Sequence, residues 1–481
     1  MIDLRRWHGW LLAVIALGFA LRLYHLGVAS LWYDEQFTRM YPDFGLRYMW
    51  TEGMRNETNP PLYFSIMLAW MHVFGSSEFS LRLPSVLIST LTIPVVYLLG
   101  HKLAGRSVGL IAALIFAIAP MELYYAQEAR TYAFMPLPAA LMLLGLASFG
   151  RWPAWVCYTV GAVLLLYLHA TAVFIVTAGG LVGLALIWRM QDRVAMLLRW
   201  VAVNVVVAAF WIPQLLGVTS QLHTNTFAWM QPTTFWDVRE SIATLIVGPA
   251  TYPDALLQAL AIVFGLALLI ALIDFRKSYQ VVMVLIGMPL ACIILMLGFT
   301  LYHPILLPRL LCWLWSPLSV LVACCMVQRR RFLLIGATSL VLMIGLGFQL
   351  AQDATAKEPW RLFLNRLDPV LRTALIVTGP STIPTPLAYY TDLGASYWPN
   401  DAAASNVVTV RMLQRLQFAN LKQADLVAAI RTGGTVVLIQ RDIDRRYPPL
   451  LDAPPPTRIV TQPCWGGHDC LSALIWGPSQ L

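Results

Sequence analysis

The sequence predicts an α-helical protein that crosses a membrane many times and ends in a small α/β domain. Of its 481 residues, 59% are hydrophobic and only 12% are charged, about half the charged fraction of an ordinary soluble domain. So few charges cannot cover the water-facing surface of a chain this long, and most of it must therefore lie in lipid. The composition excludes a disordered, coiled-coil or nucleic-acid-binding protein.

The net charge of +9 does not indicate a nucleic-acid-binding surface, because the basic residues cluster in short gaps between apolar runs. Cytoplasmic loops of membrane proteins carry an excess of lysine and arginine. We therefore expect each basic gap to face the cytoplasm. The gaps are Arg5–Arg6, Lys102–Arg106, Arg189–Arg193, Arg276–Lys277 and Arg329–Arg331.

Eleven apolar runs approach the length that a spanning helix needs, which is about 20 residues. With the basic gaps in the cytoplasm, eleven crossings put the N-terminus inside and the tail outside. We therefore predict a transmembrane module over residues 1–350 and an extracytoplasmic α/β domain over residues 351–481. The runs cover residues 9–27, 83–100, 107–123, 133–149, 153–169, 171–188, 200–218, 255–273, 280–299, 310–327 and 332–350.

One further apolar run, Leu62–Phe74, does not fit as a crossing. It is short and contains His72, and a single crossing here would turn the arginine-rich gaps outward. Two crossings would restore the orientation, but the run is too short for them. We expect a juxtamembrane or re-entrant helix on the outer face, within a first outer loop over residues 28–82.

The tail after Leu350 is less apolar than the rest of the chain and richer in charge and proline. Runs typical of strands occur at Ala374–Thr378 and Thr435–Gln440, and a helical stretch lies near Val410–Ile430. These elements predict a small α/β domain. The tail is long enough to bury a modest core of its own.

The seven cysteines follow the same division of the chain. Five lie in apolar runs without metal-type spacing, and we expect them to act as small hydrophobic residues. Cys464 and Cys470 instead lie in the polar tail, where an oxidising compartment favours disulfides. We predict a disulfide between these two cysteines.

An adjacent acidic pair, Asp34–Glu35, follows the first crossing immediately. A carboxylate near the bilayer surface could deprotonate an acceptor hydroxyl or help to bind a divalent cation. A solvated loop carboxylate is the plainer alternative. The same loop contains Asn59–Tyr63, in which two prolines stiffen the start of the following helix. Alone this is only a helix-start signal, and its interest lies in sharing a loop with the acidic pair.

The turn Tyr124–Tyr132, between two apolar helices, is dense in aromatic residues and holds an acid and a base. Tyrosines such as Tyr125 are common at membrane interfaces. Glu128 and Arg130 need a reason, because charges close to a membrane core are costly. Arg130 could bind a lipid phosphate, with Glu128 orienting it or contacting a sugar hydroxyl. A local ion pair is the alternative.

A single arginine, Arg309, opens an otherwise uncharged helix after the outer segment that begins near His303. A guanidinium holds phosphate oxygens in a planar fork, so Arg309 is a candidate phosphate ligand. Snorkelling toward the headgroups is the alternative. Arg82, at the head of the second crossing, is a similar but weaker candidate.

Acids and arginines from four separated segments therefore fall on one face of one helical bundle. This convergence suits the transfer of a group from a phosphate-bearing lipid to an acceptor hydroxyl. The sequence contains no glycine-rich phosphate loop, which favours a lipid-linked donor over a nucleotide sugar. The alternatives are a lipid-linked glycan polymerase or ligase, a flippase or transporter, and a non-catalytic assembly subunit. A transporter is disfavoured because no internal repeat is visible.

The order of these motifs resembles a known family. The residues look like the bacterial branch of glycosyltransferase family 39, whose relatives include dolichyl-phosphate-mannose–protein mannosyltransferases and the aminoarabinose transferases of lipid A. The resemblance is strongest over about residues 1–135 and looser up to residue 350. The motifs that carry it are Asp34–Glu35, Asn59–Tyr63, Leu81–Ser85, Tyr125–Tyr132 and Pro308–Arg309.

The resemblance implies a GT-C fold and a polyprenyl-phosphate sugar donor, with inversion at the anomeric carbon. Asp34 would be the catalytic carboxylate, and Glu35 beside it would contact the acceptor or a metal. The sequence assigns no cofactor, and a divalent cation, if one takes part, would bind at Asp34. The residues that would bind donor or acceptor are Asn59, Tyr63, Arg82, Tyr125, Glu128, Arg130, His303 and Arg309.

Arginine outnumbers lysine by 29 to 4, a bias typical of GC-rich bacteria. We therefore expect a multi-pass protein of the bacterial plasma (inner) membrane, with a cytoplasmic N-terminus and a periplasmic or extracellular C-terminal domain. The expected partners are the lipid bilayer, a polyprenyl-phosphate sugar that supplies a hexosyl or pentosyl group, and a lipid, glycan or protein acceptor. No nucleic acid is expected.

Overall fold

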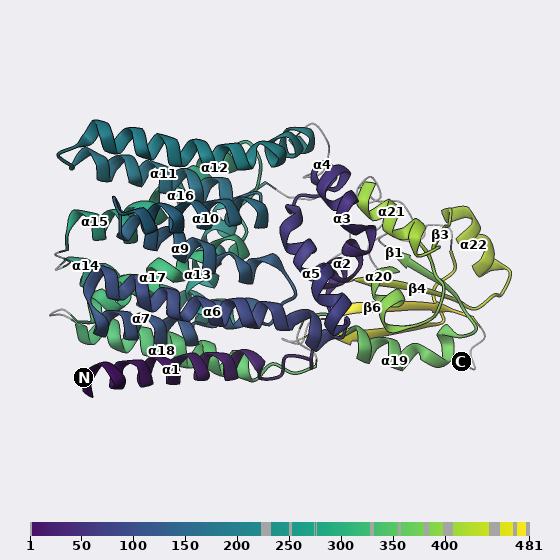
Figure 1. Ribbon diagram of the computed structural model, residues 1–481. Helices are drawn as coiled ribbons and strands as arrows, with labels where there is room; N and C mark the ends of the chain where they lie inside the picture. The colour runs from purple at the N-terminus through teal and green to yellow at the C-terminus, as the bar shows by residue number, and fades with distance from the viewer. Residues whose placement is uncertain are drawn as a thin grey trace.

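The protein consists of a long helical bundle and a smaller unit built on a β-sheet, with a layer of short helices between them (Figure 1). The N-terminus lies at the end of the bundle farthest from the sheet unit. The computed structural model describes residues 2–222, 232–249, 253–273, 275, 277–327, 331–354, 357–379, 384–397, 407–441, 453–464 and 469–477.

Every one of the eleven predicted spans coincides with helix, and the prediction of a polytopic helical fold is confirmed. Within the described ranges, six helical stretches are long and apolar enough to cross a membrane. The bent pair α7 and α8, with an angle of 55° between the two helices, makes a seventh. Four of the shorter apolar helices cover the remaining predicted spans. The bundle elements are α1 (Ile2–Leu23), α6 (Glu78–Ala104), α7 (Arg106–Ile118), α8 (Pro120–Ala126), α9 (Pro136–Ala147), α10 (Trp152–Leu168), α11 (Ala172–Trp188), α12 (Arg193–Leu222), α13 (Phe235–Val247), α14 (Asp254–Ile273), α15 (Tyr279–Val282), α16 (Met288–Thr300), α17 (Trp315–Met326) and α18 (Arg331–Leu350).

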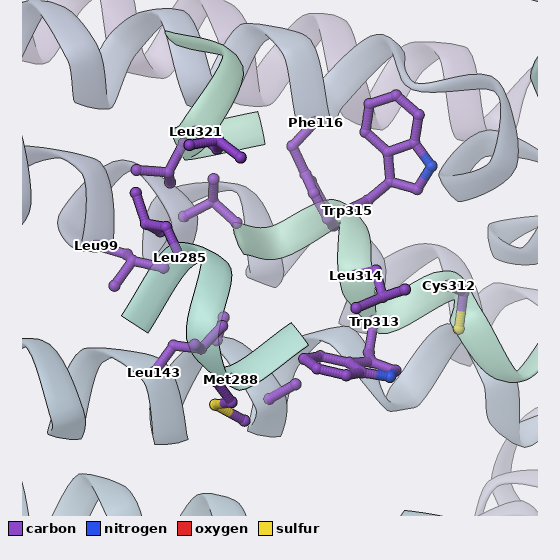
Figure 2. Packing of buried hydrophobic residues seen from close by; sticks show 14 of the residues in the cluster. Leu99, Phe116, Leu143, Leu285, Met288, Cys312, Trp313, Leu314, Trp315 and Leu321 are labelled. Atoms are coloured by element: carbon purple, nitrogen blue, oxygen red, sulfur yellow. The ribbon is translucent and has the colours of Figure 1, made fainter. Parts of the chain in front are cut away.

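Close approach of small residues holds neighbouring bundle helices together, as expected where lipid supplies no hydrophobic driving force between helices. A Cβ atom added to Gly109 on α7 would lie 2.6 Å from the carbonyl oxygen of Tyr97 on α6. Large side chains fill the remaining space. Trp313 and Trp315 are both fully buried in the continuous core shown in Figure 2.

The first outer loop folds into short helices that lie between the bundle and the sheet unit (Figure 1). The helix predicted at Leu62–Phe74 is present as α5, which begins at Pro61 because proline has the backbone angle of a helical first residue. An aromatic cluster that includes Tyr41, Tyr63 and Phe64 holds this layer together. The elements of the loop are α2 (Tyr33–Met40), η1 (Tyr41–Phe44), α3 (Gly45–Tyr48), η2 (Met49–Gly53), α4 (Met54–Asn56) and α5 (Pro61–Phe74).

The tail forms a six-stranded mixed sheet with the strand order β3-β2-β1-β4-β6-β5. The first four strands in this order pair in parallel, whereas β6 pairs antiparallel with both β4 and β5. The two predicted strands are confirmed as β1 and β4. The elements are α19 (Trp360–Leu371), β1 (Leu375–Gly379), α20 (Pro384–Tyr390), β2 (Ser396–Tyr397), α21 (Val407–Arg415), β3 (Ala419–Asn420), α22 (Gln423–Arg431), β4 (Val436–Arg441), β5 (Arg458–Pro463) and β6 (Asp469–Trp476).

The prediction of one helical stretch over Val410–Ile430 is wrong. The structure has two helices there, α21 and α22, separated by the short strand β3. Gln417 adopts a φ of 57°, which a continuing right-handed helix does not allow. The predicted disulfide is present: Cys464, just after β5, is bonded to Cys470 in β6.

Candidate active site

Three segments that are distant in sequence meet at Asp34, in the first turn of α2. Its Oδ2 atom lies 3.6 Å from a guanidinium nitrogen of Arg130 and 3.6 Å from one of Arg309. Arg130 also donates a hydrogen bond of 3.1 Å to the Asp34 carbonyl oxygen. The Asp34 side chain keeps 18% of its surface exposed. A partly accessible carboxylate is therefore held between two arginines.

Both arginines stack over one aromatic ring. Their guanidinium carbons lie 5.6 Å and 5.4 Å from the ring centre of Tyr132, for Arg130 and Arg309 respectively. Tyr125 packs edge-on against Tyr132 at 5.7 Å and completes the aromatic floor. The Nε atoms of both arginines are buried and have no hydrogen-bond partner among the described residues. Two guanidinium groups beside one carboxylate leave a surplus positive charge, which suits a phosphate group.

Glu35, which the family resemblance places in contact with the acceptor or a metal, is fully buried. Its two carboxylate oxygens accept hydrogen bonds of 2.8 and 2.7 Å from Arg82, and Oε1 also accepts one of 2.9 Å from the backbone N–H of Ala129. Burial by itself would raise the pKa of Glu35, but the charges of Arg82 and Lys357 and these hydrogen bonds lower it to about 2. Glu35 is therefore a buried, ionised anchor.

Arg82, the weaker candidate phosphate ligand in the sequence, has its donors engaged within the protein. Its side chain is 1% exposed and, besides Glu35, donates to the backbone carbonyl groups of Leu26, Ala29 and Ser30 at 2.8–3.0 Å. A guanidinium whose donors are all engaged has none left for a donor phosphate. Arg82 instead joins the end of the first helix region to α2.

Glu128 lies in a buried charge cluster with Lys357, a residue that the sequence patterns do not single out. The Nζ atom of Lys357 is 3.2 Å from Oε1 of Glu128 and 3.9 Å from Oε2 of Glu35. Burial raises the pKa of Glu128, the Lys357 charge opposes this rise, and the Glu35 charge adds to it. Lys357 follows the last bundle helix by seven residues, and no local pattern connects it with Glu128. The sequence feature that could have indicated Lys357 is the rarity of lysine, since the chain has only four.

The remaining predicted residues contact neighbours other than Asp34. Asn59 donates from its backbone and side chain to Oε1 of Glu57, at 3.1 and 3.0 Å. Tyr63 is buried edge-on against Phe134 at 5.2 Å. His303 packs against Phe299 at the end of α16, with 5.7 Å between the ring centres.

Glu57 is a second acid that the sequence analysis did not single out. It is 7% exposed, and burial raises its pKa against the hydrogen bonds from Asn59 and the charge of Arg130. The side-chain amide of Gln221, at the end of α12, donates to the carbonyl oxygens of Met54 and Glu57. Within the described ranges, no group of three or more histidine, cysteine, aspartate or glutamate residues is arranged to hold a metal ion.

The sheet unit holds α2 from the side opposite the bundle. Thr385 donates a hydrogen bond of 3.0 Å to the side chain of Gln36. The hydroxyl of Tyr390 accepts one of 2.7 Å from the backbone N–H of Leu31. The guanidinium of Arg441 lies 5.6 Å from the ring centre of Tyr33. The residues on both sides of Asp34 are therefore fixed by the C-terminal unit.

A family model described as dolichyl-phosphate-mannose-protein mannosyltransferase matches residues 58–216. The matched region contains Arg130 and the whole turn between α8 and α9. No curated protein matches the sequence of the chain.

Two solved structures extend the likeness to the whole chain. ArnT from Cupriavidus metallidurans in the apo state covers 98% of this chain with 99% of its own, at a TM-score of 0.62 and 13% identity. The structure of the same protein bound to undecaprenyl phosphate matches at a TM-score of 0.60 and 12% identity, with the same coverage of both chains. The oligosaccharyltransferase AglB from Archaeoglobus fulgidus, in complex with an inhibitory peptide and a dolichol-phosphate, covers 90% of this chain with 69% of its own, at 0.52 and 11%.

At these identities the structural likeness shows the fold. The protein is a multi-span membrane protein with the GT-C fold of glycosyltransferases. Taken with the family model over residues 58–216, the comparisons confirm the resemblance that the sequence motifs carry: the chain has the GT-C fold and is similar to glycosyltransferase family 39.

Proposed function

We propose that the protein moves a sugar from a polyprenyl-phosphate donor to an acceptor hydroxyl on the outer face of the membrane, with inversion at the anomeric carbon. The observation that carries the proposal is the placement of the Asp34 carboxylate between the guanidinium groups of Arg130 and Arg309. The arrangement offers a base and an anion-binding pair within a few ångströms of each other.

Each part has one task in the proposed reaction. The acceptor oxygen attacks the anomeric carbon while Asp34 takes its proton. The bond between that carbon and the phosphate oxygen breaks, and the polyprenyl phosphate leaves with the electron pair. Arg130 and Arg309 stabilise the negative charge that grows on the leaving phosphate. Their buried Nε atoms, which have no partner among the described residues, add unused donor capacity beside the pair.

Glu35 and Arg82 support this centre from within the protein rather than touching substrate. The pair fixes the start of α2, because Glu35 follows Asp34 directly and is bonded to both Arg82 and the Ala129 backbone. Asp34 and Arg130 are thus both tied to the same buried carboxylate. We assign the lining of the acceptor and sugar sites to the surrounding side chains of Asn59, Tyr63, Tyr125 and His303, whereas the buried Glu128, paired with Lys357, supports the turn that carries Arg130.

The lipid-phosphate donor is supported by the solved structures with the same fold. One ArnT structure contains undecaprenyl phosphate, and the archaeal AglB structure contains a dolichol-phosphate. The surplus positive charge around Asp34 in this chain suits the same kind of group. The proposal names the substrates only by class. The sugar is a hexosyl or pentosyl group, and the acceptor is a lipid, glycan or protein.

We further propose that the protein lies in a bacterial inner membrane, with residues 1–350 as the transmembrane module and residues 351–481 outside the cytoplasm. The disulfide between Cys464 and Cys470 supports this orientation, because disulfides persist in oxidising compartments. The arginine-rich gaps between the spans support it from the other side of the membrane.

The test is a transfer assay in liposomes with a panel of labelled polyprenyl-phosphate sugars and a membrane extract as the source of acceptor. Wild-type protein should release polyprenyl phosphate from at least one donor, and Asp34→Asn should release none above background. Asp43→Asn is the matched control, because Asp43 lies in the same loop with a 38% exposed side chain paired to Arg39. Equal turnover by wild type and Asp34→Asn would refute the proposal.

A further inference from the structure

Lys357 enters the buried core of the site from outside the helical bundle. Its side chain is 9% exposed, and its ammonium group lies over the ring of Tyr124 at 5.3 Å and 3.4 Å from the carbonyl oxygen of Gln127. Its backbone has a φ of 62°, a conformation that costs free energy in a residue with a side chain. Such a conformation persists where surrounding contacts hold it.

Three successive residues of the turn that carries Arg130 are each held by a different element. The side-chain amide of Gln127 donates to the carbonyl oxygens of Arg22 and Tyr24 at the end of α1. Ser85 of α6 donates to the Glu128 carbonyl oxygen at 2.6 Å. The backbone N–H of Ala129 donates to Glu35, as described above. Lys357 adds the contact to the Glu128 side chain.

The charges in this cluster balance only when Lys357 is present. Glu35 and Glu128 are both buried, and Arg82 is committed to Glu35. Within the described part of the chain, Lys357 is the sole basic side chain within 4 Å of the Glu128 carboxylate. A buried charge without a partner is strongly destabilising. Without Lys357, the turn next to Arg130 would therefore carry an uncompensated negative charge.

The next residue along the chain is anchored in the sheet unit. The Glu358 carboxylate is paired with Arg441 of β4 and accepts a hydrogen bond of 2.8 Å from the Trp360 indole. Arg361 is paired with Glu78 at the start of α6. Lys357 and Glu358 thus connect the charge cluster under Asp34 directly to the first helix and a central strand of the C-terminal unit.

We propose that Lys357 is a positioning residue that couples the C-terminal unit to the Asp34–Arg130 pair, by neutralising Glu128 and fixing the turn that presents Arg130. The inference rests on the proposed function, because the step that it serves is the proposed sugar transfer. Lys357 itself touches neither donor nor acceptor. A small displacement of a positioned catalytic pair can lower the rate by about a hundredfold.

Four variants test this role by their turnover in the transfer assay. Lys357→Met keeps an apolar side chain of similar length but removes the charge, and it should lower kcat at least tenfold. Lys357→Arg keeps the charge and should retain at least a third of wild-type kcat. Lys357→Met combined with Glu128→Gln removes both charges and should recover most of the lost kcat. Lys422→Met, at an exposed lysine that precedes α22, is the control and should match wild type.

The pH profile gives a readout that a merely structural role would not move. Besides Lys357, the groups facing Glu128 are Glu35 and Asp34 from α2, Tyr63 from α5, Arg82 from α6, and Tyr124 and Tyr125 from α8. In Lys357→Met, proton uptake by Glu128 removes the surplus charge. The kcat of Lys357→Met relative to wild type should therefore rise as the pH falls, and in the variant that also carries Glu128→Gln this rise should disappear.

Failure of this inference differs from failure of the proposed function. If wild type turns over a donor and depends on Asp34, but Lys357→Met retains wild-type kcat or the double variant is no better than Lys357→Met, the positioning role is refuted. If wild type turns over no donor, the proposed function fails. The melting temperatures of wild type, Lys357→Met, Glu128→Gln and the double variant then still test the Lys357–Glu128 coupling, which is refuted if the two substitutions act additively.

Discussion

Replacing Arg82 with methionine would leave the buried carboxylate of Glu35 without its bidentate partner. Methionine fills much of the same volume but provides no donor, so the contacts to the carbonyl groups of Leu26, Ala29 and Ser30 are lost as well. Breaking a buried ion pair by removing one partner costs about 3–5 kcal/mol. We therefore expect Arg82→Met to be among the most destabilising single changes outside the membrane-spanning core.

The lowered pKa of Glu35 corresponds to a free energy of the same order. Lowering the pKa from 4.5 to about 2 corresponds to about 3 kcal/mol of stability. Because the folded-state pKa is the lower one, this contribution is fully present above pH 4.5 and is lost as the pH falls toward 2. The difference in stability between wild type and Arg82→Met should therefore shrink as the pH falls below about 4.5.

The assay is thermal unfolding of detergent-solubilised protein, followed by tryptophan fluorescence at one scan rate. With an unfolding entropy of about 2 cal/mol/K per residue, a loss of 3–5 kcal/mol lowers the Tm of a chain of this length by about 3–5 °C. Arg39→Met is the matched control. Its pair with Asp43 is exposed on both sides, so it should change the Tm by less than about 1 °C. If Arg82→Met has the same Tm as Arg39→Met, the argument from the buried ion pair is refuted.

Three further changes have expected outcomes. Arg309→Ala should weaken equilibrium binding of a fluorescent polyprenyl-phosphate ligand by about ten- to a hundredfold, since a hydrogen bond to a charged group contributes about 1.5–3 kcal/mol; unchanged affinity would exclude Arg309 from the phosphate site. Tyr390→Phe should speed amide exchange at Leu31, whose N–H bonds to the Tyr390 hydroxyl; exchange as slow as in wild type would show that this contact does not protect the loop. In unreduced native membranes, Cys464 should resist alkylation and become reactive only after reduction; ready labelling without a reductant would contradict the disulfide.

The bundle could be predicted from sequence because its signals are local. Apolar runs of nearly spanning length and the arginine-rich gaps between them depend on neighbouring residues alone, and every predicted span is helical in the structure. The tail was harder, because the strand runs are short. The prediction of one helical stretch over Val410–Ile430 is wrong because a single residue, Gln417, has a positive φ. The composition of the segment does not indicate such a conformation.

The site was predictable in part, for a physical reason. Charges are costly near a membrane, so Asp34, Arg130 and Arg309 stood out from apolar surroundings, and the structure brings these three together. Which charges pair with each other depends on tertiary contacts over hundreds of residues. Lys357 and Glu128 are 229 positions apart, and the sequence could not show that Glu35 turns inward while its neighbour Asp34 stays accessible.

The most direct test of the account separates chemistry from donor binding at Asp34. Turnover and equilibrium binding of the same polyprenyl-phosphate sugar would be measured side by side for wild type, Asp34→Asn and Asp43→Asn. The account predicts that Asp34→Asn loses turnover but binds the donor at least as tightly as wild type, because the change removes a negative charge beside Arg130 and Arg309. Retained turnover in Asp34→Asn, or loss of donor binding together with turnover, would contradict it.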